Sequence, residues 1–340
     1  MKFSKEESVI LELIQQGFNP VLEPYKYIAE KAGLEEERVL SIIGDLKERK
    51  LIRNIAGIFE GKSLGYKLSL VAFKVKEENI EQAARVINSH PGVSHNYLRE
   101  HKFNIWFTLA EESTEAFEKS LSAIFSKSGA DDYLVFKNEK LFKIGVMLDI
   151  GKSSDKREPL IPSLKKISHE KNFTISDNMK KSIFILQQDL PVEKNPFVRL
   201  IEKNNIDINV NDLIDNFKTL IDAGVMRRYA AVLRHRNVGY TSNAMTAWKI
   251  NDDFDPEIFI KHKAITHLYL RTIYPGKWEY PLFAMIHARS KDELAEILNG
   301  LSKESGINEY LVLNSLREFK KSRVQYFSEE FINWKRENYD

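Results

Sequence analysis

The chain has 340 residues, 51 Lys and Arg against 49 Asp and Glu, a formal net charge of +2 and no cysteine. At roughly 150 residues per domain, this length predicts two domains or a duplicated unit. Without cysteine, the chain has no disulfides, thiolate metal sites, iron–sulfur clusters or cysteine nucleophiles. The small net charge provides no general attraction to polyanions. A charged N-terminal segment and the lack of a long apolar run predict a cytoplasmic protein without a membrane partner.

The sequence contains one unit twice. Residues 51–66 (LIRNIAGIFEGKSLGY) align without a gap with residues 225–240 (VMRRYAAVLRHRNVGY), and residues 92–100 (GVSHNYLRE) align with residues 264–272 (AITHLYLRT). The matches keep their order across most of each half. Residues 151–176 are rich in Ser and Lys and predict a linker between the two copies.

In chain order, the first copy opens with three segments of helical periodicity, Lys5–Gln16, Pro24–Ala32 and Glu35–Lys50. The alternating segment Leu51–Tyr66 contains a Gly-Lys turn and predicts a two-stranded wing. Together these elements predict a winged helix-turn-helix.

The segments that follow alternate between strand and helix patterns. They are Lys67–Val75, Glu78–Ser89, Gly92–Glu100, Asn104–Ala110, Thr114–Ser126 and Tyr133–Leu148. This β-α-β-β-α-β order is that of a ferredoxin-like domain, and the second copy repeats both parts.

The predicted fold class is α+β, a tandem repeat of a winged helix-turn-helix and a ferredoxin-like domain. The repeat is expected to form a pseudo-dimer in which the two ferredoxin-like sheets face each other. The predicted boundaries are 1–65 and 66–150 for the first copy, 151–176 for the linker, 177–240 and 241–325 for the second copy, and 326–340 for a C-terminal helix.

This arrangement resembles the feast/famine (Lrp/AsnC-type) transcription regulators, in which the first part reads DNA and the second dimerises and binds an amino acid. The presumed recognition helices argue against DNA as a partner. The first opens with Glu35, Glu36 and Glu37, and the second carries several aspartates against Lys218. Phosphate contacts require Lys or Arg at the contact face, whereas acidic residues at a helix N-terminus also simply stabilise the helix.

Basic residues are concentrated instead in residues 227–236, RRYAAVLRHR. Strand alternation places Arg228, Arg234 and Arg236 on one face, and Arg227, Tyr229 and His235 on the other. A planar guanidinium matches the two oxygens of a carboxylate. The alternative is a solvated edge strand whose positive charges block unwanted pairing.

Two aligned segments, 95–107 and 267–283, carry the same polar stripe. Alternation places His95, Tyr97 and Arg99 on one face, and His267, Tyr269 and Arg271 on the equivalent face, with Trp106 and Trp278 close by. Such a stripe is costly to bury without polar partners, so it predicts a solvated face or a polar pocket. The indole rings offer flat surfaces to a planar ligand, and the recurrence of the stripe favours a binding site.

Longer motifs resemble the siroheme decarboxylase family. They are PYKYIAEKAG, IRNIAGIFEGKSLGY and INSHPGVSHNYLREHKFNIWFTL in the first copy, and RRYAAVLRHRNVGYTSNAM and WEYPLF in the second. That family is a heterodimeric branch of the Lrp/AsnC-like superfamily, so this chain looks like a fusion of its two subunits. The resemblance implies conversion of siroheme to 12,18-didecarboxysiroheme with release of two CO2, in alternative haem or haem d1 biosynthesis. It implies no cofactor of the protein's own, because the iron belongs to the substrate.

Such a reaction needs cations for the substrate carboxylates, walls for the macrocycle and proton donors for the carbons that lose CO2. The candidate carboxylate-binding residues are Arg99, Arg228, Arg234, Arg236 and Arg271, and the candidate walls are Trp106, Trp278 and Tyr280. The candidate proton donors are His95, His101, His235, His267 and Tyr229. His95 or His267 is also a candidate axial ligand to the substrate iron, and no other metal site is expected.

The sequence leaves open which histidine donates a proton and which binds iron. It also leaves open whether the pseudo-dimer assembles further. Two other classes of function remain as alternatives: a regulator or tetrapyrrole sensor that binds without turnover, and a scaffold in which duplication merely builds a stable pseudo-dimer.

Overall fold

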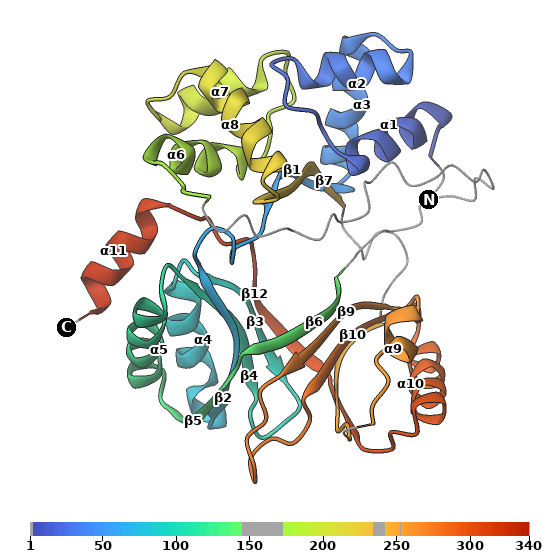
Figure 1. Cartoon of the computed structure of the whole chain (residues 1–340), viewed down its shortest axis with the longest axis vertical. Helices are drawn as coiled ribbons and strands as arrows, with labels where there is room; N and C mark the ends of the chain where they lie inside the picture. Colours follow the sequence, from blue (N-terminus) through green and yellow to red (C-terminus); the bar gives the residue numbers. More distant parts are fainter. Residues whose placement is uncertain (1–2, 145–172, 234–241, 252, 340) are drawn as a thin grey trace. The chain divides into compact units, whose positions relative to one another are not determined.

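The computed structural model describes residues 3–144, 173–233, 242–251 and 253–339 (Figure 1). The chain divides into two compact units, and each unit combines the same part of both repeats. The first comprises residues 1–64, 148–238 and 325–328, and the second comprises residues 65–147, 239–324 and 329–340. We call them the helical unit and the sheet unit. Most of the predicted linker 151–176, up to residue 172, lies outside the described residues.

The helical unit contains one group of three helices from each repeat. They are α1 (Lys5–Gln16), α2 (Pro24–Ala32) and α3 (Glu36–Glu48), then α6 (Asp177–Leu186), α7 (Pro196–Asn204) and α8 (Val210–Asp222). Helix α1 begins with a capping box between Ser4 and Glu7. Helices α2 and α7 both begin at a proline, whose fixed φ suits the first helical turn.

The strand that follows each helix group pairs with its counterpart from the other repeat. Strands β1 (Ile52–Phe59) and β7 (Met226–Leu233) form an antiparallel two-stranded sheet with Ala56 opposite Ala230. The prediction of a hairpin within residues 51–66 is therefore wrong. An unpaired strand needs a partner for its backbone groups, and the other repeat supplies one with the same alternation, while the chain after β1 turns into the next domain.

The sheet unit contains two β-α-β-β-α-β repeats. The first consists of β2 (Lys67–Val75), α4 (Ile80–Ser89), β3 (Val93–Arg99), β4 (Ile105–Glu111), α5 (Thr114–Ser128) and β5 (Ala130–Phe136), with a short 3-10 turn, η1 (Glu77–Asn79), before α4. The second consists of β8 (Ser242–Trp248), α9 (Glu257–Lys261), β9 (Ile265–Arg271), β10 (Leu282–Ala288), α10 (Lys291–Ser305) and β11 (Tyr310–Leu313). Helices α5 and α10 have matching caps, a serine hydroxyl at the start and a left-handed glycine at the end.

One further strand follows each repeat and joins the sheet of the other repeat. Strand β6 (Asn138–Ile144) pairs with β9, and β12 (Ser315–Lys321) pairs with β3. The two sheets therefore have the orders β12-β3-β4-β2-β5 and β11-β8-β10-β9-β6. The single strand predicted at Tyr133–Leu148 is wrong, because the chain forms two strands there that belong to different sheets.

A lysine anchors each exchanged strand on a helix of the other repeat. Lys320 Nζ donates to the carbonyl oxygens of Asn88 (2.8 Å) and His90 (3.2 Å), at the end of α4. Lys143 Nζ donates to the carbonyl oxygen of His262 (2.8 Å), at the end of α9. A positive charge at a helix C-terminus interacts favourably with the helix dipole.

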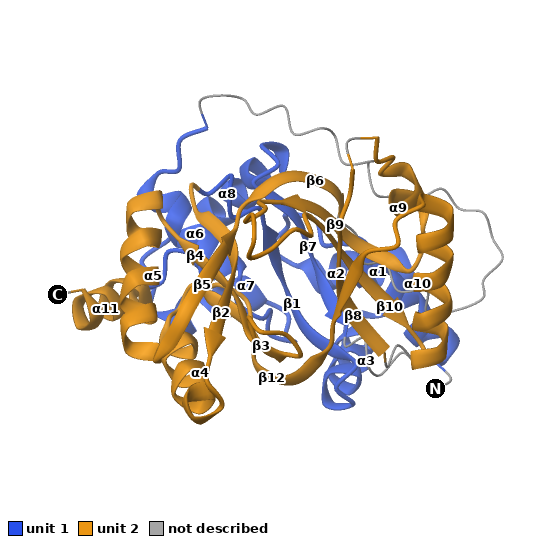
Figure 2. Cartoon of the chain, turned by 90° about the horizontal axis from the view of Figure 1, so that it is seen from below, with its two compact units in different colours: residues 1–64, 148–238, 325–328 blue, residues 65–147, 239–324, 329–340 orange. Residues whose placement is uncertain are grey.

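The two sheets lie between two outer layers of helices, with α4 and α5 on one side and α9 and α10 on the other (Figure 2). Each helix layer packs on its own sheet through an apolar core. A third core lies between the sheets and joins residues of both repeats; Trp106, Phe136, Trp278 and Phe283 are each at most 2% exposed there. The prediction that the two sheets face each other is confirmed.

The C-terminal helix α11 (Glu329–Asn338) follows the second repeat but packs on α5 of the first repeat. Its apolar side is buried through Phe331 and Trp334. Among the described helices, none combines the length and apolarity needed to cross a membrane.

Candidate active site

The two predicted polar stripes lie on the inner faces of the two sheets. Tyr97 lies opposite Trp106, and Tyr269 lies opposite Phe283, which places both stripes on the faces that contact the third core. The ring centroids of His95 and Tyr97 are 6.2 Å apart, and those of His267 and Tyr269 are also 6.2 Å apart. The structure therefore gives each repeat the same row of imidazole, phenol and guanidinium.

Each row ends in an arginine that stacks on the tyrosine before it. The guanidinium carbon of Arg99 lies 5.1 Å from the Tyr97 ring centroid, and that of Arg271 lies 4.7 Å from the Tyr269 ring centroid. Such cation–π contacts add to the packing of a desolvated guanidinium.

Both arginines also donate to the other repeat. Arg99 Nη1 donates to the carbonyl oxygen of Leu313 (2.7 Å), and Arg271 Nη1 donates to the carbonyl oxygen of Phe136 (3.0 Å). Burial lowers the pKa of each guanidinium to about 10, and each Nε is buried without a hydrogen-bond partner. Among the described residues, no carboxylate pairs with either side chain. Two desolvated cations without an acidic partner are suited to receive carboxylates from a ligand.

The stripe histidines are oriented by the hydroxyl groups of the residues that precede them. Ser94 Oγ lies 3.0 Å from His95 Nδ1, and Thr266 Oγ1 lies 2.9 Å from His267 Nδ1. Both imidazoles are half-buried. A fixed ring nitrogen and partial access to solvent are what a proton donor or an iron ligand requires.

The remaining candidates of the sheet unit surround the inner core. Trp106 and Trp278 are 5.3 Å apart between centroids and are almost fully buried, so the structure gives them a packing role rather than open walls. Tyr280 keeps part of its surface exposed beside Trp278. His101 packs against Trp278, its Nδ1 accepts from the backbone N–H of Phe103, and burial lowers its pKa.

The other candidates belong to the helical unit or lie outside the described residues. Tyr229 is 1% exposed and packs on Phe18, Phe197 and Phe217, and burial raises its pKa well above the ordinary value. Tyr229 is thus a core residue of the helical unit, and its role as a proton donor stays a prediction. Arg228 is half-buried, and burial lowers its pKa. Arg234, His235 and Arg236 lie outside the described residues.

Three residues beside His267 are not among the predicted site residues. Thr266, His287 and Asn243 extend the hydrogen bonds of His267 across the inner face of the second sheet. The repeat does not predict His287, because the first repeat has Ala110 at the corresponding position. In the strand pairing, Ala110 lies opposite Leu68 just as His287 lies opposite Asn243.

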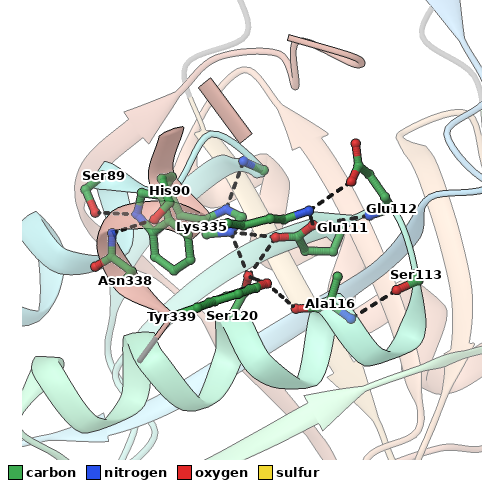
Figure 3. A network of polar contacts seen from close by, with 12 residues as sticks. Ser89, His90, Glu111, Glu112, Ser113, Ala116, Ser120, Lys335, Asn338 and Tyr339 are labelled. Atoms are coloured by element: carbon green, nitrogen blue, oxygen red, sulfur yellow. Dashed lines mark hydrogen bonds and ion pairs between the residues drawn. The ribbon is translucent and has the colours of Figure 1, made fainter. Parts of the chain in front are cut away.

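A second polar cluster, also missed, lies on the helix side of the first sheet (Figure 3). Glu111 accepts from Ser120 Oγ (2.6 Å), contacts His90 Nε2 (3.0 Å) and pairs with Lys335 Nζ (2.9 Å) of α11. His90 Nδ1 accepts from the backbone N–H of Gly92, so Nε2 carries the proton that points at Glu111.

The centre of this cluster is closed to solvent. His90, Glu111 and Ser120 are fully buried, and Tyr339 adds a hydroxyl 2.9 Å from Ser120 Oγ. Hydrogen bonds from His90, Ser120 and Lys335 outweigh the desolvation of Glu111 and lower its pKa to about 2, whereas burial lowers the pKa of His90. The cluster has a structural role, because it connects α11 to the first repeat through buried hydrogen bonds and an ion pair. Elsewhere too, the described residues contain no group of three or more His, Asp and Glu side chains that could hold a metal ion.

The comparisons with known proteins first define a class. The family model of the AsnC-like ligand binding domain matches residues 63–143 and again residues 237–320. The family model of the siroheme decarboxylase NirDL-like HTH domain matches residues 7–53. The chain is thus a duplicated protein of the Lrp/AsnC-like class.

The relatives then identify the family. The siroheme decarboxylase of Hydrogenobacter thermophilus is 36% identical over 335 residues, which cover 96% of this chain and 97% of the relative. The crystal structure of the siroheme decarboxylase NirDL superposes with a TM-score of 0.77 at 32% identity and covers 98% of both chains. The chain belongs to the siroheme decarboxylase family.

Separate subunits of the same family each match part of the chain. The siroheme decarboxylase beta subunit of Oleidesulfovibrio alaskensis is 34% identical over 45% of this chain and 98% of the subunit. The alpha subunit of the same organism is 40% identical over 40% of this chain and 83% of the subunit. The prediction of a single-chain fused form is confirmed.

Proposed function

We propose that this chain is a siroheme decarboxylase, a carboxy-lyase that converts siroheme to 12,18-didecarboxysiroheme. One observation carries the proposal: the chain matches a siroheme decarboxylase over nearly the whole length of both proteins, at 36% identity. A second supports it. A co-complex of the matching structure with an iron-uroporphyrin III analogue superposes with a TM-score of 0.77, so that protein binds a carboxylate-rich iron macrocycle.

The reaction breaks one carbon–carbon bond in each of two ring acetates. The electron pair of that bond stays on the former methylene carbon and is delocalised into the pyrrole, while the carboxylate leaves as CO2. A general acid then protonates the carbon and leaves a methyl group. The protein must hold the other carboxylates firmly and keep the departing one poorly solvated.

The arginines and histidines of the two rows supply the required chemistry. We assign carboxylate binding to Arg271 and Arg99, because each is desolvated and has no acidic partner among the described residues. We assign proton donation to the oriented imidazoles of His267 and His95, with His101 as a further candidate. In this proposal the iron enters with the substrate, either histidine of the rows can ligate it, and the protein needs no cofactor of its own.

Arg228 stays a predicted carboxylate-binding residue of the helical unit. It is half-buried, and no ion pair holds it among the described residues. Its neighbour Arg227 instead pairs with Glu60.

Anaerobic incubation of the purified chain with siroheme, followed by mass spectrometry of the extracted tetrapyrrole, tests the proposal. Loss of two CO2 masses is the expected result. If the chain binds siroheme but leaves it unchanged, the result would contradict decarboxylation and favour a tetrapyrrole sensor. If the chain does not bind siroheme at all, the result would favour the alternative functions of a structural scaffold or a transcription regulator.

We further propose that the helix groups do not bind DNA. Helix α3 carries Glu36 and Glu37 in its first turn, and Glu37 pairs with Lys194. This pair neutralises a cation that a phosphate would need. A mobility-shift assay with genomic fragments at stated salt should show no specific shift; a specific shift would overturn this assignment.

A further inference from the structure

Four side chains form a continuous line of hydrogen bonds on the inner face of the second sheet. Asn243 Oδ1 lies 2.7 Å from His287 Nδ1, and His287 Nε2 lies 2.9 Å from Thr266 Oγ1. Thr266 Oγ1 in turn lies 2.9 Å from His267 Nδ1. The line thus joins two histidines through one hydroxyl group.

Asn243 Oδ1 faces His287 Nδ1, and with a neutral His287 this end group sets the direction of every bond in the line. An amide oxygen only accepts, so His287 Nδ1 donates to Asn243. A neutral imidazole that donates through Nδ1 accepts through Nε2, so the Thr266 hydroxyl donates to His287. That hydroxyl has one proton, so its oxygen accepts from His267 Nδ1. His267 therefore carries its proton on Nδ1 and its lone pair on Nε2.

The first repeat has apolar side chains where the second repeat has Asn243 and His287. Leu68 and Ala110 occupy the positions of Asn243 and His287 in the strand pairing. Ser94 Oγ contacts both His95 Nδ1 and Thr108 Oγ1, and either hydroxyl of the 2.7 Å pair can be the donor. The contact of Ser94 Oγ with His95 Nδ1 is therefore compatible with both tautomers of His95, whereas the line that begins at Asn243 selects one tautomer of His267.

We propose that His287 is a positioning residue that, through Thr266, holds His267 in the Nδ1–H tautomer and presents Nε2 of His267 to the ligand. The tautomer is inferred from this hydrogen-bond line with His287 neutral, and it does not depend on the reaction. Its use in decarboxylation rests on the proposed function: Nε2 is the atom that takes up a proton and delivers it to the former methylene carbon, or that ligates the substrate iron.

Two-bond proton–nitrogen NMR correlations of the 15N-histidine-labelled full chain test the tautomer without any substrate. In the unsubstituted protein, we expect His267 as the Nδ1–H tautomer. His287→Leu removes the acceptor for the Thr266 hydroxyl, which then donates to His267 Nδ1 and moves its proton to Nε2. Thr108→Val, a change beside His95, is the matched control and should leave the His267 signals in place. An Nε2–H tautomer in the unsubstituted protein, or no change in His287→Leu, overturns the proposal.

A conservative substitution separates positioning from a loss of folding. Gln at position 287 offers an amide oxygen that can still accept from Thr266. We expect His287→Leu to lower kcat on siroheme about tenfold with little change in KM, and His287→Gln to retain most of the turnover.

An equal loss of kcat in His287→Leu and His287→Gln would contradict the positioning role of His287. If the unsubstituted chain does not turn over siroheme, the proposed function fails while the NMR result still decides the tautomer. The two proposals can therefore fail separately.

Discussion

The two ferredoxin-like repeats share their strand order, their helix caps and a row of His, Tyr and Arg, but they bury their other polar groups in different places. In the first repeat, Glu111 and Ser120 form a charged cluster on the helix side of the sheet. In the second repeat, the ends of β10 and the middle of α10 carry Ala288 and Ile297 at these positions.

On the inner faces of the sheets, the second repeat carries the additional polar groups. The second repeat carries the line of hydrogen bonds that ends at His267, where the first repeat has apolar Leu68 and Ala110. Both repeats share the same framework. The first repeat adds the charged cluster that holds α11, and the second adds the polar line beside His267. Four predictions test how the two repeats differ.

The largest effect should come from the charged cluster. Glu111→Ala removes the buried partner of Lys335, Ser120 and His90, so we expect the free energy of unfolding to fall by about 3–5 kcal/mol. Chemical denaturation measures it. Glu112→Ala is the matched control, because this half-exposed carboxylate also pairs with Lys335 and should cost less than about 1 kcal/mol. Equal costs would show that the buried cluster does not fasten α11.

The same cluster should make the free energy of unfolding depend on pH in the acidic range. The pKa of Glu111 is lowered from 4.5 in the unfolded chain to about 2 in the fold, so its stabilisation is complete above pH 4.5 and is lost as the pH falls towards 2. The pKa of His90 is lowered below 6.5, so protonation of the unfolded chain adds to the loss below that pH.

Unfolding measured between pH 7 and pH 2 checks this dependence. The stability difference between the unsubstituted protein and Glu111→Ala should narrow as the pH falls from 4.5 towards 2. A difference that stays constant over this interval would contradict the lowered pKa.

The anchors of the exchanged strands should differ in strength. Lys320 donates to two carbonyl oxygens and Lys143 to one, so we expect Lys320→Met to cost about 2 kcal/mol and Lys143→Met about 1 kcal/mol. Each variant serves as the control for the other in the same denaturation experiment. The reverse order would show that the two strand exchanges are held by other contacts.

A difference in ligand binding, with no large change in stability, should separate the two row arginines. Arg99 is 5% exposed, whereas Arg271 keeps more surface open, so a ligand carboxylate should depend more on Arg271. We expect Arg271→Lys to raise the KM for siroheme about tenfold through loss of two-point hydrogen bonding. Arg99→Lys should leave the KM within about threefold of its original value. Steady-state kinetics would contradict the distinction if both variants changed the KM equally.

Local patterns in the sequence predicted most elements of the fold. Helical periodicity located α1, α2 and α3 almost to the residue, and strand alternation correctly placed Tyr97 and Arg99 on one face. Such patterns depend only on which residues are buried, and burial is the same whichever strand lies alongside.

The partner of each strand was not predictable for the same reason. Strands β1, β6 and β12 keep their alternation while they pair with the other repeat, and nothing in their own residues states which edge they join. The rows of the candidate site were found because they occur twice. His287 and Glu111 were missed because each occurs in one repeat only and becomes meaningful through partners distant in sequence.

The exchange of strands also governs how the chain can be made. Strand β3 ends at Arg99, but β12, the strand that pairs with its edge, begins only at Ser315. Strand β1 likewise has no partner until β7 has been synthesised. At a synthesis rate of about 5–20 residues per second, the edge of β3 waits roughly ten to forty seconds for its partner. The first repeat therefore leaves the ribosome with an open sheet edge that is prone to incorrect pairing. Its native sheet is completed only after β12 (Ser315–Lys321) has been synthesised.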